Sequence, residues 1–118
     1  MKIFVLHYTK LTDRKKNIIL QFKKHNIIDY EFIEKFDKDE INDIYNLKFE
    51  KIKLGSASLI LKHHYVYKQI SEFNNDNDNN NNNNNNNGNN NDNDNDFLIL
   101  EDDVILTDNF MSILNKYK

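Results

Sequence analysis

The sequence predicts an α/β fold in which a mainly parallel sheet is flanked by helices. The short apolar runs at residues 3–6 and 97–100 are typical of strands that are buried in such a sheet. Two longer segments, 13–25 and 56–73, carry apolar residues at helical spacing. Strands and helices therefore alternate along the chain, as expected for parallel strands that are joined by helical crossovers.

The first part of the chain predicts two strands around an amphipathic helix. The strands are expected over Lys2–His7 and Tyr30–Ile33, and the helix over Asp13–His25. One face of this helix collects its apolar residues and a histidine, namely Ile18, Ile19, Phe22 and His25. Lysines occupy the other faces, and Thr12 or Asp13 is expected to cap the start.

The middle of the chain predicts one long helix. A short helix or a loop is expected over Lys38–Asn46, whereas the pattern over Lys48–Leu54 is ambiguous. The long helix is expected over Ser56–Phe73, with Ser56 or Ser58 as its cap. Its apolar stripe is formed by Leu59, Leu61, His63, Val66, Ile70 and Phe73.

The last part of the chain predicts a strand and a closing helix. The strand is expected over Phe97–Leu100, buried on both faces of the sheet. The helix is expected over Asp108–Tyr117, with Thr107 or Asp108 at its N-cap.

The tract 74–96 consists almost entirely of Asn and Asp, and it interrupts this pattern. Because it has no apolar residue to bury, we expect a disordered insertion. The domain is therefore predicted in two parts, residues 1–73 and 97–118, with the insertion 74–96 between them. At 118 residues the chain has the length of one small domain.

Composition excludes several kinds of site and partner. The chain has no cysteine, which rules out disulfides and thiolate metal sites. Five of the 19 acidic residues and none of the 16 basic residues lie in the insertion, so the remainder is mildly basic. Its basic residues do not form the dense face with aromatic platforms that a nucleic-acid interface needs. Neither a signal peptide nor a membrane-spanning run is present, so a cytoplasmic location is expected.

The acidic triplet Glu101-Asp102-Asp103 follows the last apolar run directly. Ligands of α/β sheets bind beyond the carboxyl ends of strands, and right-handed crossovers place the residues after Leu6 at the same edge. Unpaired carboxylates are costly to bury, so a positive partner is expected there. A divalent cation that bridges to a ligand phosphate would meet this need; a solvated turn is the alternative.

Three segments in order resemble the amino-terminal part of glycosyltransferase family 25, which includes lipooligosaccharide and collagen galactosyltransferases. The first is the run 3–8 followed by Asp13-Arg14, with His7 and Tyr8 where the family usually has Asn and Leu. The second is the run 60–68, with His63 matching the family's His and Lys62 replacing its Ser. The third is the acidic motif within 98–104. The resemblance covers nearly all of this chain outside the Asn-rich tract, but only about half of a family-type catalytic domain.

This resemblance implies part of a GT-A-like, Rossmann-like fold that binds a nucleotide-diphosphate sugar, with a UDP-sugar as the expected donor and a glycan or protein hydroxyl as acceptor. It also implies Mn²⁺ or Mg²⁺ and inversion at the anomeric carbon. Asp103 would bind the metal directly. Glu101 would bind it directly or through water, or would contact the ribose. The donor-binding residues would be His7, Tyr8, Arg14, His63 and Asp102.

Each donor-site residue also has a purely structural alternative. His7 could bond to backbone at the strand end, Tyr8 could pack on the first helix, and Arg14 could form a surface ion pair. His63 could be a satisfied core histidine, and Asp102 could orient its neighbours. Lys62 and His64 are expected to face solvent, and the residues here do not identify a catalytic base.

Two other functions remain open. The chain could be a truncated, inactive relative that at most binds metal or nucleotide sugar. It could also be another magnesium-dependent α/β domain, such as a receiver-like or phosphohydrolase-like module. That module would need a carboxylate after the first strand, where His7 and Tyr8 stand instead.

Overall fold

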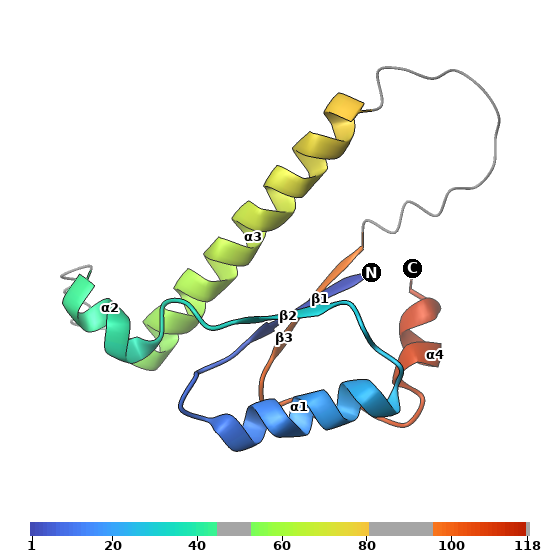
Figure 1. The fold of residues 1–118 in the computed structure, drawn as a ribbon, viewed down its shortest axis with the longest axis horizontal. Coiled ribbons are helices and arrows are strands. Elements are labelled where there is room, and N and C mark those ends of the chain that lie inside the picture. Colours follow the sequence, from blue (N-terminus) through green and yellow to red (C-terminus); the bar gives the residue numbers. More distant parts are fainter. Residues whose placement is uncertain (45–52, 81–95, 118) are drawn as a thin grey trace.

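A computed structural model describes residues 1–44, 53–80 and 96–117 (Figure 1). The elements in chain order are β1 (Lys2–Leu6), α1 (Thr12–Lys24), β2 (Tyr30–Ile33), α2 (Lys38–Ile44), α3 (Leu54–Asn80), β3 (Phe97–Glu101) and α4 (Phe110–Asn115). The described strands form one parallel sheet in the order β2-β1-β3. The predicted α/β class is therefore confirmed. The predictions for 48–52 and 81–95 lie outside the described residues.

The register aligns the carboxyl ends of the strands. Leu6 of β1 pairs with Ile33 of β2 on one side and with Glu101 of β3 on the other. The residues that follow these three positions therefore emerge at one edge of the sheet. This confirms the prediction that the loop after β1 and the acidic triplet lie together.

The side chains of β1 alternate between two apolar clusters, as the pleat of a strand requires. Ile3 and Val5 pack with Ile18 and Phe22 of α1 on one face. On the other face Phe4 and Leu6 pack with a different buried group, which includes Ile33 and Val66. Figure 1 shows α1 and α3 on opposite sides of the sheet. Burial of β1 on both faces explains its continuous apolar sequence.

The pattern of burial differs from the predictions at two places. β3 is only half-buried, because it is the outer strand of the described sheet rather than a central one. In α1 Ile18 and Phe22 are buried, but Ile19 is 38% exposed. One residue along a helix turns the side chain by about 100°, which carries Ile19 away from the sheet.

The helix ends also differ from the predictions. The N-cap of α1 is Leu11 and that of α4 is Asn109, and neither makes a side-chain capping bond. α3 begins before Ser56, so its serines lie inside the helix, where Ser58 donates to the carbonyl of Phe36. It also continues past Phe73 to Asn80, because the hydrogen bonds of a helix are local and need no core partner. No described helix combines the length and the apolarity that crossing a membrane requires.

Lys62 is buried, contrary to the predicted exposure, with 3% of its surface accessible. Its ammonium donates to the carbonyls of His7 (3.0 Å) and Lys35 (2.7 Å), which lie just past β1 and β2. It also donates to the Asp37 carboxylate at 2.7 Å. Parallel strands leave carbonyl groups at their carboxyl ends without ladder partners, and Lys62 satisfies them from α3.

Asp37 completes this buried ion pair. Besides Lys62 it accepts from the amide (3.2 Å) and the hydroxyl (2.6 Å) of Thr9. Burial alone would raise the pKa of Asp37, but the hydrogen bonds from Lys62 and Thr9 outweigh that effect and lower it. The folded state therefore holds Asp37 as a carboxylate.

The first prediction concerns the contribution of this ion pair to the free energy of unfolding. Lys62→Met should cost about 3–5 kcal/mol in the free energy of unfolding, because it leaves a buried carboxylate unpaired. Urea unfolding followed by circular dichroism measures the change, with Lys68→Met on the exposed side of the same helix as control. Equal small losses in the two variants would contradict a stabilising role for Lys62.

The second prediction concerns acid stability. Because the pKa of Asp37 is lowered by folding, its contribution is complete above its unfolded pKa of about 4 and is lost as the pH falls through the folded value. The wild type should therefore be more stable than Asp37→Asn near pH 6, and the gap should shrink on acidification. Urea midpoints from neutral to strongly acidic pH measure it. A gap that does not change with pH would refute the linkage.

Candidate functional site

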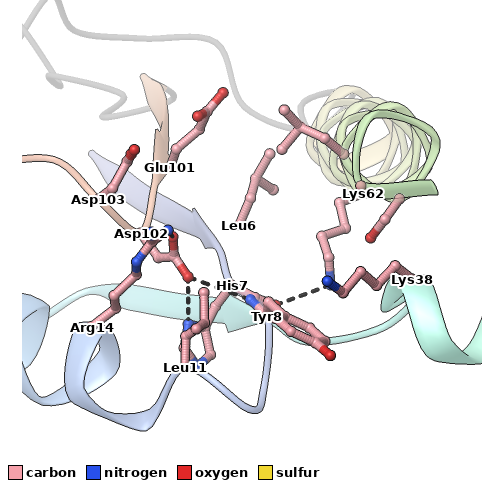
Figure 2. Close-up of a pocket in the computed structure, with 13 residues that line it drawn as sticks. Leu6, His7, Tyr8, Leu11, Arg14, Lys38, Lys62, Glu101, Asp102 and Asp103 are labelled. Carbon is pink, nitrogen blue, oxygen red and sulfur yellow. Dashed lines mark hydrogen bonds and ion pairs between the residues drawn. The ribbon is translucent and has the colours of Figure 1, made fainter. Parts of the chain in front are cut away.

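A pocket of about 240 Å³ opens at the carboxyl edge of the sheet. Its walls come from the loop after β1, the start of α1, α2, one face of α3 and the end of β3 (Figure 2). Nine of its 13 lining residues carry polar or charged side chains: His7, Tyr8, Arg14, Lys38, Ser58, Lys62, Glu101, Asp102 and Asp103. The predicted site residues after β1 and β3 thus meet in one place.

Asp102 is the buried member of the acidic triplet, with 7% of its surface exposed. One carboxylate oxygen, Oδ2, lies 2.8 Å from His7 Nδ1 and 3.4 Å from the Tyr8 amide. The other, Oδ1, accepts from Arg14 Nη1 at 3.1 Å. Because a carboxylate only accepts, His7 Nδ1 carries the proton in this pair. The expected positive partner of this carboxylate is therefore Arg14.

Glu101 and Asp103 differ from Asp102 in exposure and in hydrogen bonding. Both are exposed, and neither side chain has a hydrogen bond or ion pair with the described part of the chain. Figure 2 shows their carboxylates extending away from the bonded side chain of Asp102. They are the two acidic groups that remain available to a ligand.

The triplet alone does not form a closed metal centre. Across residues 1–44, 53–80 and 96–117, no group of three or more His, Asp or Glu side chains is placed to hold an ion. Mg²⁺-like ions, however, commonly use one or two carboxylates and take their other ligands from water and substrate phosphates. Glu101 and Asp103 fit an ion of that kind.

Tyr8 packs toward α2 rather than on α1. Its hydroxyl donates to Asp39 at 2.6 Å, and the Lys38 ammonium lies 5.0 Å from its ring centroid. The hydrogen bond to Asp39 raises the pKa of Tyr8. Asp39 also pairs with Lys10 at 2.7 Å, and the bonds from Lys10 and Tyr8 lower its pKa. The Tyr8 ring is therefore held in place at the pocket wall.

Arg14 lies in the first turn of α1, which starts beside the loop after β1. Its side chain is 48% exposed while its partner Asp102 is buried. It is also the single arginine of the sequence. The start of α1 therefore brings one permanently charged guanidinium to the pocket rim.

His63 lies outside this pocket, although the resemblance implies a donor-site role for it. Its ring lies 5.9 Å from Tyr67 on α3, and its buried Nδ1 atom has no hydrogen-bond partner among the described residues. Lys62 faces the sheet, and the next residue of a helix points about 100° away. The neighbouring His64 is exposed, as expected.

Lys62, Lys38 and Ser58 are polar pocket residues that the sequence reasoning did not assign to the site. A signal for Lys62 was present in its spacing, because it lies four residues after Ser58 and four before Val66, both buried. Such spacing indicates the sheet-facing side of α3. Lysines are rarely buried, however, so the residue type favours a solvent-facing position. Around Lys38 the apolar residues show no helical or strand periodicity, so the sequence does not indicate which way its side chain points.

Comparison with known proteins gives one distant relative. No family model and no solved structure matches the chain. Over 123 aligned positions it is 26% identical to a protein of Acanthamoeba polyphaga mimivirus that carries the name "putative glycosyltransferase". The alignment covers 98% of this chain but 32% of the relative, so the chain spans about a third of that protein's length. The chain is therefore similar, along nearly all of its length, to one part of a protein that is named as a putative glycosyltransferase.

Proposed function

We propose that this chain forms the donor-binding portion of a metal-dependent, family 25-like glycosyltransferase. The observation that carries the proposal is the pocket at the carboxyl edge of the sheet, where two free carboxylates and a guanidinium lie together. The similarity to a protein named as a glycosyltransferase supports the same class. The donor would be a nucleotide-diphosphate sugar, such as a UDP-sugar, and the acceptor a hydroxyl of a glycan or protein.

The charges of the pocket suit a diphosphate. Arg14 supplies a guanidinium at the rim, and Lys38 an ammonium near Tyr8. Glu101 and Asp103 would hold Mn²⁺ or Mg²⁺, with Asp103 as the direct ligand. When bound, such an ion would neutralise the charge that develops on the departing diphosphate. The cationic groups would thus contact the diphosphate of the donor directly, and the anionic groups would contact it through the metal ion.

The remaining residues would orient the donor. The Tyr8 ring, fixed by Asp39 and Lys38, offers a surface on which a base such as uracil could stack. His7 would contribute indirectly, because its hydrogen bond to Asp102 orients that carboxylate. In the transfer the acceptor hydroxyl oxygen would bond to the anomeric carbon as the bond to the diphosphate breaks, with inversion. The hydroxyl proton would pass to a base that these residues do not identify.

Binding without turnover is the second candidate function. The observation that favours it is that the described pocket holds charged groups suited to binding, whereas its residues identify no base for the acceptor hydroxyl. On this interpretation the pocket would bind metal and nucleotide sugar, while transfer would need further residues. The two candidates share the site and differ only in the chemical step.

The third prediction tests the metal ligands. Asp103→Asn should weaken Mn²⁺ binding in the presence of UDP by roughly 100-fold, because even outer-shell changes cost about 10- to 100-fold. Glu101→Gln should have a smaller effect. Titration calorimetry measures both, with Asp108→Asn as a matched control, since Asp108 pairs with Lys24 away from the pocket. Unchanged binding in Asp103→Asn would remove the proposed metal site.

The fourth prediction separates turnover from binding. Wild-type protein with Mn²⁺ and a panel of nucleotide-diphosphate sugars should release nucleoside diphosphate if the chain is catalytic, and Asp103→Asn should abolish the release. Binding of donor without release identifies a binding portion. Absence of both binding and release across the panel would contradict the glycosyltransferase proposal.

A further inference from the structure

We infer that Asp102 is a positioning residue, which pins Arg14 so that the free edge of its guanidinium faces the pocket as a receptor for a phosphate group. This inference deepens the proposed function and rests on it for the identity of the full donor. It assigns Asp102 neither to the metal nor to the sugar. The ligand chemistry it names is a phosphate or pyrophosphate anion.

The first step is that Asp102 is already occupied. Both of its oxygens accept hydrogen bonds, Oδ2 from His7 Nδ1 at 2.8 Å and Oδ1 from Arg14 Nη1 at 3.1 Å. Only 9% of its side chain is exposed. A carboxylate that binds a metal ion in this pocket needs oxygens that are free and accessible. Glu101 and Asp103 are exposed, whereas Asp102 is buried and bonded.

The second step is that Arg14 keeps most of its donors. A guanidinium has five N–H groups in a rigid fork. The described contacts use Nη1 alone, and the side chain is 48% exposed at the pocket rim. A planar group held at one nitrogen presents its other donors in a set direction, so less entropy is lost when an anion binds.

The third step is that His7 holds the carboxylate from the inside. His7 is 1% exposed, and its Nδ1 contact with Asp102 is at 2.8 Å. Its other ring nitrogen, Nε2, is buried without a hydrogen-bond partner in the described part of the protein. The imidazole therefore has one polar contact that sets its orientation, and that contact orients the carboxylate toward Arg14.

The experiment uses the fact that Arg14 is the single arginine of the chain. Its side-chain Nε–Hε signal in a ¹H–¹⁵N NMR spectrum is therefore unambiguous. In the wild type, rotation about the Nε–Cζ bond should be slow, because Asp102 holds one edge. Asp102→Asn, which keeps the shape and removes the charge, should speed this rotation, whereas the matched control Asp108→Asn should not. Fast rotation in the wild type would overturn the inference without any variant.

Binding of inorganic pyrophosphate, measured without metal, tests the consequence. Asp102→Asn should weaken it about tenfold, the range of one charge-assisted hydrogen bond. Arg14→Ala should weaken it at least as much, and the double variant should be no weaker than Arg14→Ala alone. Arg14→Lys should restore only part of the affinity, because an ammonium lacks the fork. Additive losses, or no pyrophosphate binding by the wild type, would overturn the inference.

Metal binding distinguishes this inference from the proposed function. Asp102→Asn should leave Mn²⁺ affinity in the absence of any nucleotide within about twofold of the wild type, since Asp102 does not touch the ion. A loss as large as the one that Asp103→Asn shows under the same conditions would overturn the positioning role. A wild type that binds pyrophosphate but neither Mn²⁺ nor any nucleotide sugar would remove the proposed function. The receptor formed by Arg14 and Asp102 would then stand.

Discussion

The alignment of three parallel strand ends is the constraint on which this structure depends. Leu6, Ile33 and Glu101 lie in register, so carbonyl groups and polar side chains at all three strand ends emerge at the same edge without partners in the sheet. Where helices cover the sheet, water cannot supply their hydrogen bonds. Charged side chains from elsewhere in the sequence supply them instead.

Two hydrogen-bonded clusters lie at this edge, one centred on a cation and the other on an anion. On the β2 side the buried ammonium of Lys62 donates to carbonyl oxygens and to Asp37. On the β3 side the buried carboxylate of Asp102 accepts from His7 and Arg14. The pocket lies between them, and both clusters contact His7. The polar groups that stabilise the fold therefore also shape the candidate site, while Glu101 and Asp103 remain available to a ligand.

Prediction from sequence succeeded where a signal is local and repeated. The apolar run of β1 and the helical spacing of Ile18 and Phe22 follow from periodicities of two and of about 3.6 residues, so strand, helix and parallel order could be predicted. It failed at Ile19 and at the helix caps, because propensity does not say which flank of a helix meets the sheet. It failed at Lys62 because a lysine is assigned to solvent unless its partners are known.

The sequence by itself determined the fold class and the meeting of the loop after β1 with the acidic triplet, because hydrophobic period and crossover handedness act through neighbouring residues. Only the tertiary structure decided the separate roles within that triplet. In the sequence, nothing distinguishes the roles of three adjacent carboxylates. The direction of each side chain at the end of β3 and in the turn that follows made Asp102 the partner of Arg14 and left Glu101 and Asp103 exposed. That difference depends on residues some ninety positions away, whose approach no local pattern encodes.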